Sequence, residues 1–110
     1  MIPQYVYNAK VISVYDGDTI TVEIDLGMSI KTTQKIRLYG IDTPELRGEE
    51  REEGLKVRDA LRSLVLDKEV VLQTFKDKKG KYGRYLGKIY LGDVNINELL
   101  LERGWAVRYS

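Results

Sequence analysis

The 110 residues contain neither cysteine nor histidine, and 18 basic and 17 acidic side chains leave a net charge of +1. The two missing residue types exclude disulfide scaffolds, thiolate nucleophiles, imidazole-based triads and the usual zinc sites. The near-neutral charge excludes binding of a polyanion by overall charge alone, so such a contact has to come from a local cluster. A chain of this length fits one compact domain over residues 1–110.

The N-terminal residues Met1-Ile2-Pro3-Gln4 lack the basic and then apolar pattern of a signal peptide. No apolar stretch approaches the length of a membrane span, so we expect no membrane association. These observations favour a protein that works inside a cell. Secretion stays open as an alternative if a leader was removed.

Alternating apolar residues predict strands in the first third of the chain. Residues 5–14 form the first predicted strand, and Asp16-Gly17 follows as a hairpin turn, because both residues tolerate positive φ. A second strand is indicated by the clean alternation of Ile20, Val22, Ile24 and Leu26 with polar residues. A loop opens at Gly27, and residues 36–39 form a short third strand.

The remainder of the chain predicts two helices and two further strands. Residues 49–66 carry the apolar stripe of a core-facing helix, and residues 70–75 and 85–91 are typical of strands. Asn95 with Glu98 predicts the capped start of a last helix that stops at Gly104. Five strands with helices after the third and the fifth predict a mainly β fold, an OB-type five-stranded barrel.

Two carboxylates are predicted at strand ends. Asp18 follows the first turn and Asp42 follows the third strand, so both can reach one cation at the barrel rim. Oxygen ligands suit Ca²⁺ or Mg²⁺. Taken alone, each aspartate is explained as well by a role in shaping a turn. Glu45, beyond the stiff Pro44, either faces a bound water or is an exposed loop residue.

The cationic side chains form the second candidate set. Arg37 lies on the short third strand and Arg84 at the start of the fifth, and guanidinium groups bind phosphate through paired hydrogen bonds. Each arginine alone is equally a surface charge. The basic turn before Arg84, with Lys81 and Tyr82 at its end, is either a solvated turn or a loop that steers phosphate.

In combination, these fragments resemble the staphylococcal nuclease (thermonuclease) family. The resemblance runs from Val11 to Ala106, and the order and spacing of its fragments are specific. The fragments are Val14-Tyr15-Asp16-Gly17-Asp18-Thr19, Arg37-Leu38-Tyr39-Gly40-Ile41-Asp42-Thr43-Pro44-Glu45, Lys81-Tyr82-Gly83-Arg84 and Val94-Asn95-Ile96-Asn97-Glu98.

The resemblance implies a Ca²⁺-dependent endonuclease that acts on DNA and RNA, preferably single-stranded or frayed, and leaves 3′-phosphate ends. It implies that Asp18 and Asp42 ligate calcium through their carboxylates and Thr43 through its backbone carbonyl. Asp16 would lie in the outer shell.

The resemblance also implies the catalytic groups. Glu45 would act on the attacking water, as general base or as a positioning group, while Arg37 and Arg84 would grip the scissile phosphate. Lys81 and Tyr82 would contact a neighbouring phosphate of the substrate. Tyr109 occupies a loosely aligned region in which the family has a base-stacking tyrosine, so the sequence leaves its role open.

A catalytically silent OB module that binds nucleic acid or protein is the alternative. Nuclease-like repeats of this kind occur in Tudor-staphylococcal-nuclease proteins and lack parts of the acidic and arginine set. Here the full set occurs together, which favours the enzyme: Asp18, Arg37, Asp42, Glu45 and Arg84. The sequence shows no oligomer interface signal, so we expect a monomer.

Overall fold

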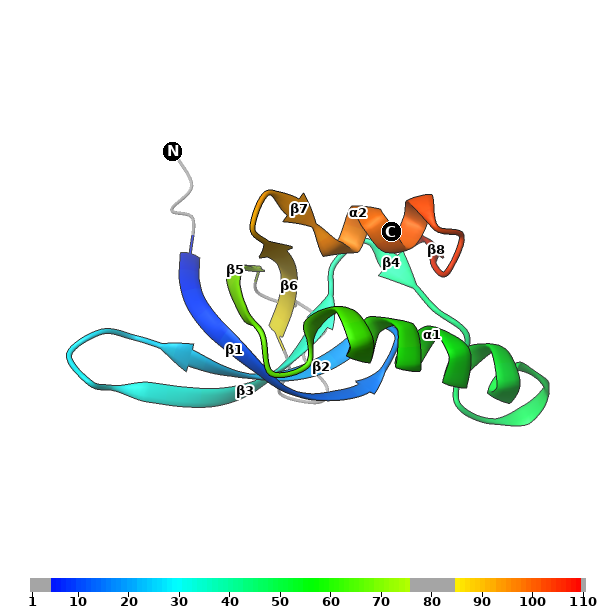
Figure 1. Cartoon of the computed structure of the whole chain (residues 1–110), viewed down its shortest axis with the longest axis horizontal. Coiled ribbons are helices and arrows are strands. Elements are labelled where there is room, and N and C mark those ends of the chain that lie inside the picture. The colour runs from blue at the N-terminus through cyan, green and yellow to red at the C-terminus, as the bar shows by residue number, and fades with distance from the viewer. Residues whose placement is uncertain (1–4, 76–84, 110) are drawn as a thin grey trace.

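The computed structural model describes residues 5–75 and 85–109, and five strands in this part form a closed barrel (Figure 1). The strand order is β3-β2-β1-β5-β6, with β3 and β6 pairing in parallel to close the barrel and all other neighbours antiparallel. The predicted OB-type barrel with two helices is confirmed. The strands are β1 (Tyr5–Asp16), β2 (Thr19–Asp25), β3 (Lys31–Leu38), β5 (Glu69–Phe75) and β6 (Tyr85–Leu91).

A bulge in β1 corrects the predicted alternation. The register against β2 shifts between Val11 and Ser13, so Ser13 is exposed and Val14 takes the next core position. The strand also continues to Asp16, so the two-residue turn is Gly17-Asp18 and not Asp16-Gly17. Asp18 is therefore a residue of the turn itself, and not the first residue of β2.

The third strand is longer than predicted. It begins at Lys31 and pairs with β2 from there to Arg37. The sequence pattern missed its first half because the half-buried positions Thr32 and Gln34 carry polar side chains. The β2–β3 hairpin and α1 (Arg51–Val65) lie at opposite ends of the long axis in Figure 1.

Both predicted helices are present. A 3₁₀ turn, η1 (Gly48–Glu50), precedes α1, whose buried face is formed by Gly54, Val57, Leu61 and Val65. At α2 (Ile96–Glu102), the Asn95 side chain accepts a hydrogen bond of 3.1 Å from the Glu98 backbone N–H, as predicted. The Glu98 carboxylate accepts a hydrogen bond of 3.3 Å from the Arg108 guanidinium, so this side chain contacts the C-terminal segment. No helix in the described ranges is long and apolar enough to span a membrane.

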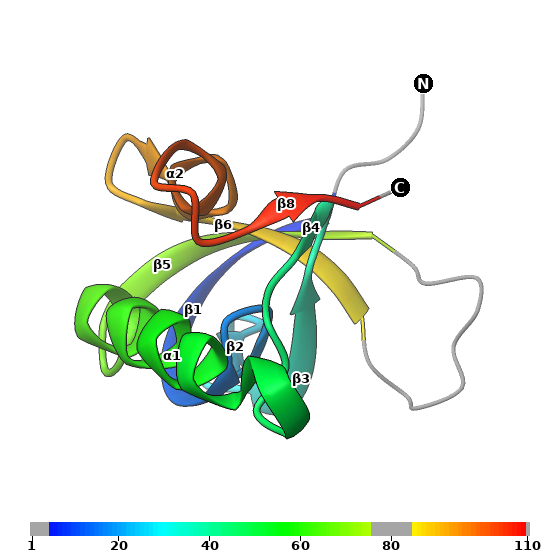
Figure 2. The same cartoon turned by 90° about the vertical axis from the view of Figure 1, so that its right-hand side faces the viewer.

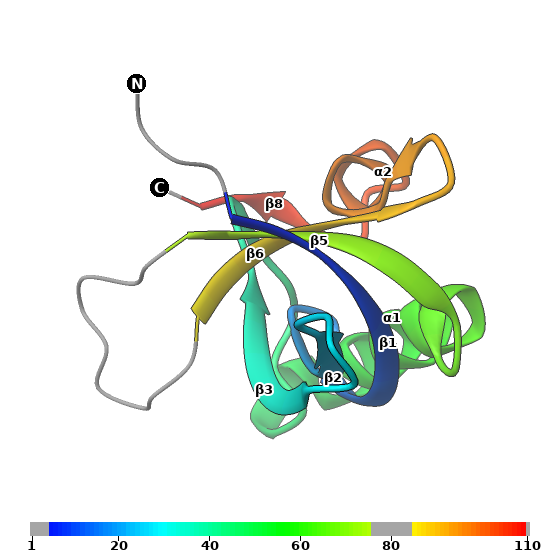
Figure 3. The same cartoon turned by 90° about the vertical axis from the view of Figure 1, so that its left-hand side faces the viewer.

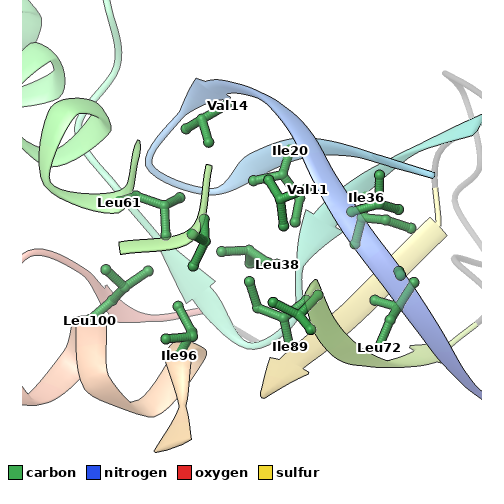
Figure 4. Packing of buried hydrophobic residues seen from close by; sticks show 14 of the residues in the cluster. Val11, Val14, Ile20, Ile36, Leu38, Leu61, Leu72, Ile89, Ile96 and Leu100 are labelled. Carbon is green, nitrogen blue, oxygen red and sulfur yellow. The ribbon is translucent and has the colours of Figure 1, made fainter. Parts of the chain in front are cut away.

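The barrel interior and both helices share one hydrophobic core. Ile36, Leu38 and Leu72 fill the barrel, while Leu61 and Leu100 extend the core to α1 and α2 (Figure 4). Each is fully buried, which stabilises the fold by about 1.5–3 kcal/mol per side chain. This packing fixes where the strand ends emerge at the rim.

Short pairings that the sequence did not predict tie the C-terminal segment to the rim. β4 (Ile41–Asp42) pairs with β8 (Val107–Arg108) (Figure 2), and β7 (Val94–Asn95) pairs with β6 (Figure 1). The buried Asn97 donates to the carbonyls of Tyr39 (2.9 Å) and Gly87 (3.1 Å) and accepts from the Ile89 N–H (3.2 Å). One amide thus provides partners for three backbone groups where β3 ends beside β6.

Candidate functional site

Arg37 joins the two predicted aspartates at one rim of the barrel. Its Nη1 lies 2.9 Å from Asp18 Oδ2, and its Nη2 lies 3.6 Å from Asp42 Oδ1. Nη2 also donates to the Ile41 carbonyl at 3.2 Å. The Arg37 side chain is only 15% exposed, so these contacts hold the guanidinium in one place. Three residues from three different segments of the chain, Asp18, Arg37 and Asp42, therefore lie in contact at this rim.

Asp18 is buried and held by several donors. Its carboxylate accepts from the Thr43 backbone N–H (3.3 Å) and from the Thr19 hydroxyl (3.2 Å). Burial alone would raise the pKa of Asp18, but its hydrogen bonds to Asp16 and Arg37 and the guanidinium charge outweigh burial and lower that pKa. The same pair raises the pKa of Arg37 against the effect of burial. The rim therefore carries a fixed carboxylate and a fixed cation at neutral pH.

Asp16 lies directly beside Asp18. Its Oδ1 accepts from the Asp18 backbone N–H at 3.1 Å. Burial, and then the hydrogen bond and charge of the Asp18 side chain, raise the pKa of Asp16 to about 6. Two carboxylates so close resist ionising together in the absence of a cation.

Asp16→Asn is expected to stabilise the metal-free protein at pH 8. Because the pKa of Asp16 is raised, its protonated form favours folding at low pH, and this stability is lost as pH rises from about 4 through about 6. The asparagine removes that loss and can keep the bond to the Asp18 N–H. We expect a gain of about 1 kcal/mol at pH 8, after allowance for solvent screening, and almost none at pH 4.

Urea unfolding of both proteins in chelator at the two pH values measures this difference. Asp59 forms an exposed ion pair with Arg58 on α1 and gives the matched control. The Asp59→Asn change should alter stability equally at both pH values. A gain that is as large at pH 4 as at pH 8 would contradict the raised pKa of Asp16.

Glu45 lies to one side of the Arg37 cluster. Its side chain is 68% exposed, and its Oε2 is 3.9 Å from Arg47 Nε. Glu45 and Arg47 line a hollow of about 330 Å³ together with Tyr15, Asp16 and Leu46. The structure thus places Glu45 in the same hollow as Asp16, next to the aspartate turn.

Two glycines allow close contact with the segment that carries Thr43 and Glu45, Gly54 from α1 and Gly17 from the β1–β2 turn. A Cβ at Gly54 would lie 2.9 Å from the Pro44 carbonyl oxygen and 2.8 Å from the Glu45 carbonyl carbon. A Cβ at Gly17 would lie 2.8 Å from Thr43 Oγ1. The sequence reading missed both contacts. The available signal was a glycine on the buried stripe of α1, where a larger residue is usual.

Tyr109 packs against the arginine of the rim. The Arg37 Cζ lies 5.2 Å from the centre of the Tyr109 ring, and the Tyr109 N–H donates to the Gly40 carbonyl at 3.0 Å. The remaining predicted site residues, Lys81, Tyr82 and Arg84, lie outside the described residues.

The donor chemistry of the rim fits a hard divalent cation. Asp18 and Asp42 would supply carboxylates, and Thr43, whose backbone N–H donates to Asp18, would supply its carbonyl oxygen. Among the buried side-chain polar atoms of the described residues, the Thr43 hydroxyl oxygen is the one without a hydrogen-bond partner. Within residues 5–75 and 85–109, no group of three or more Asp, Glu, His or Cys side chains is placed to hold a metal ion. Water or substrate oxygens would complete the coordination.

Comparisons with known proteins match this chain to one family model and to several relatives. The family model described as staphylococcal nuclease homologue matches residues 35–110. A thermonuclease of Staphylococcus hyicus is 35% identical over 100 residues, which cover 88% of this chain and 56% of that protein.

Two further relatives extend the comparison. An uncharacterised protein of Methanocaldococcus jannaschii is 32% identical over 128 residues, covering 94% of this chain and 59% of the relative. An uncharacterised endonuclease of Haemophilus influenzae is 34% identical over 101 residues, covering 92% and 52%. The chain thus spans between 52% and 59% of the length of these three relatives.

Proposed function

Because this chain belongs to the staphylococcal nuclease family, we propose that it is a Ca²⁺-dependent endonuclease that hydrolyses phosphodiester bonds of DNA and RNA. The observation that carries the proposal is the Arg37 guanidinium held between Asp18 and Asp42 at one rim. A thermonuclease and an endonuclease among the relatives support the reaction class.

The proposed calcium site consists of the Asp18 and Asp42 carboxylates and the Thr43 carbonyl, with Asp16 in the outer shell. The bound ion supplies Lewis-acid polarisation of the phosphoryl group. The protein's own contribution is to hold these oxygens in advance. Asp18 is fixed by the Thr43 N–H and by Arg37, so little reordering is needed on binding.

Arg37 is proposed to bind the scissile phosphate. A guanidinium has five N–H donors, and the contacts with Asp18 and Ile41 leave others for phosphate oxygens. During in-line displacement, charge grows on the equatorial oxygens, and a cation that is already fixed stabilises that charge. Tyr109 packs against the guanidinium and restricts its motion. Arg84 is proposed as the second phosphate-binding arginine.

Glu45 is proposed to act on the attacking water, as general base or by positioning it. Its carboxylate is exposed in the hollow next to Asp16, where water has access. The new bond forms between the water oxygen and phosphorus, and the bond from phosphorus to the 5′-oxygen breaks. The water proton passes to Glu45 or to solvent, the 5′-oxygen takes up a proton, and the 3′-phosphate end remains.

The proposed substrates are single-stranded or frayed segments of DNA and RNA. The proposed contacts from Lys81 and Tyr82 reach a phosphate, and phosphate contacts carry no sequence information. We therefore expect little base preference. The protein is proposed to act as a monomer.

The deciding experiment follows cleavage of denatured DNA with Ca²⁺ and with excess chelator. We expect cleavage in Ca²⁺, none in chelator, and a loss of about 100-fold in rate for Asp42→Asn. Asp42 is half exposed, so this variant should fold normally. Asp59→Asn on the exposed side of α1 is the matched control and should keep full activity.

Two results would contradict the proposal in different ways. Cleavage that persists in chelator would remove the metal from the mechanism. Binding of DNA without cleavage, tested with Ca²⁺, Mg²⁺ and Mn²⁺, would instead support the silent OB module.

A further inference from the structure

The first half of β3 is an open sheet edge in the described part of the chain. β2 pairs with β3 along its whole length from Lys31 to Arg37, whereas β6 pairs only from Ile36 to Leu38. Within residues 5–75 and 85–109, no strand pairs with residues 31–35 on the side away from β2. In Figure 3, β2 lies between β3 and β1.

The printed hydrogen bonds show which backbone groups face the open side. The Leu38 N–H donates to the Asp18 carbonyl, and the Leu26 N–H donates to the Ile30 carbonyl. The backbone groups of even-numbered residues in β3 therefore face β2. Tyr39 N–H donates to Gly87 of β6, so odd-numbered positions face the other way. By the alternation of an antiparallel pair, the N–H and C=O of Lys31, Thr33 and Lys35 point to the open side.

A hollow of about 410 Å³ lies on one face of this edge. Thr32, Gln34 and Ile36 of β3 line it, and the Gln34 amide donates to the Thr32 hydroxyl at 3.1 Å. None of its lining residues is charged. The other walls are largely apolar or aromatic and include Tyr5, Tyr7, Ile24, Leu26 and Tyr85.

On the opposite face, β3 presents two lysines, while β2 places Asp25 across from Lys31 and Glu23 across from Thr33. Lys31, Thr33 and Lys35 are exposed there in a row. Lys31 Nζ is 3.5 Å from Glu23 but stays 59% exposed, and no ion pair of Lys35 occurs among the described residues. A second copy paired antiparallel about Thr33 would set Lys31 against Lys35, and like charges directly opposite destabilise a ladder. The edge therefore disfavours its own copy.

We propose that the open edge of β3 binds an extended peptide segment of a partner protein by strand addition. The partner has acidic residues at every second position and apolar residues between them. Cross-strand neighbours point to the same face of a sheet, so the acidic side chains lie beside Lys31 and Lys35, and the apolar ones enter the hollow. This interaction goes beyond the proposed nuclease activity and does not rest on it.

The backbone groups favour a peptide over a nucleic acid strand. The edge offers three outward carbonyls, at Lys31, Thr33 and Lys35, that need hydrogen-bond donors. A DNA sugar-phosphate backbone only accepts hydrogen bonds, and an RNA backbone adds only the 2′-hydroxyl as a donor, whereas a peptide strand offers alternating N–H and C=O groups. The hollow likewise has no cationic side chain to attract a phosphate.

The test uses the acetylated and amidated peptide Glu-Val-Glu-Phe-Glu-Val-Glu with a fluorescent label, measured by anisotropy against the full chain in chelator. In strand addition, only one alternate set of peptide N–H groups faces β3. If the peptide lies antiparallel to β3, the Glu N–H groups are the set that faces β3. We expect N-methylation of that set to weaken binding at least about tenfold. Methylation of the other set should leave binding within about twofold.

Protein variants test the same contact from the other side. Thr33→Pro removes an N–H that faces the open edge and is not used by β2, so we expect at least about tenfold weaker binding. Thr33→Ala keeps the N–H and is the matched control, with unchanged binding. Lys35→Glu should weaken the glutamate peptide and strengthen its lysine counterpart, Lys-Val-Lys-Phe-Lys-Val-Lys. Circular dichroism checks the fold of each variant.

The outcomes separate clearly. Equal binding of both methylated peptides, or no binding of the unmethylated one at about 1 mM, overturns the proposal, and this comparison holds even if Thr33→Pro fails to fold. A single-stranded oligonucleotide that protects the Thr33 amide from hydrogen exchange, where the peptide does not, overturns it in favour of nucleic acid. Protection of the Lys31, Thr33 and Lys35 amides by the peptide supports it.

Discussion

Arg37→Lys is expected to lower the rate of phosphodiester cleavage by about 100- to 1000-fold. A lysine keeps a positive charge beside Asp18 but loses the planar fork, which contacts Asp18, Asp42 and the Ile41 carbonyl at once. The transition state then meets a mobile point charge in place of fixed donors. Single-turnover cleavage of a labelled single-stranded oligonucleotide measures the chemical step.

The matched control for this prediction is Arg58→Lys. Arg58 pairs with the exposed Asp59 on α1, so its replacement should change the rate less than about twofold. If Arg37→Lys cleaves as fast as the natural protein, Arg37 is a structural partner of Asp18 and not a catalytic residue.

Comparison with Arg37→Ala separates folding from catalysis. Alanine leaves the Asp18 carboxylate buried without its cation, so we expect about 3 kcal/mol lower stability at pH 7. Lysine should lower the free energy of unfolding by about 1 kcal/mol at most, because the charge remains. A similar rate loss in two variants of unequal stability would show that Arg37 acts on the reaction directly.

Gly54→Ala is expected to destabilise the fold by about 2–3 kcal/mol and to lower cleavage as well. Glycine to alanine within a helix normally stabilises it by about 1 kcal/mol. Here the new methyl group meets the Pro44 carbonyl oxygen and the Glu45 carbonyl, which are backbone atoms and cannot rotate away. Either α1 or the segment that carries Thr43 and Glu45 has to move.

Thermal and urea unfolding measure the stability change, and single-turnover cleavage the activity. Ser63→Ala, at an exposed position of the same helix, reports the helix propensity effect alone and should be neutral or slightly stabilising. A Gly54→Ala protein at least as stable as the natural one would mean that the contact between α1 and the Pro44 segment is looser than the structure shows.

The barrel could be predicted because most of its strands show the alternation of buried apolar and exposed polar residues in their own sequence. Ile20, Val22 and Ile24 alternate with polar residues, and that period is set by the pleat of a strand. The first half of β3 escaped prediction because its half-buried side chains, Thr32 and Gln34, are polar. The end of β1 escaped because a bulge at Ser13 depends on its pairing with β2 and not on its own pattern.

The chemical inventory of the candidate site was equally readable, since carboxylates and guanidinium groups are visible as residue types. Their contacts were not. The distance from Arg37 to Asp18 depends on the register between β2 and β3, and the position of Asp42 depends on the small β4–β8 pairing. Neither has a signal within a short window of sequence.

The sequence by itself determined the element types and the set of groups available for chemistry, because both follow from local periodicity and side-chain identity. Only the tertiary structure decided that Arg37 is nearly buried against Asp18. It also decided that Asn97 hydrogen-bonds to the backbone where β3 pairs with β6, and that Gly54 allows the Pro44 segment to pack closely against α1. These contacts join residues far apart in the chain. Their formation depends on how closely the packed backbones approach one another, which no single segment encodes.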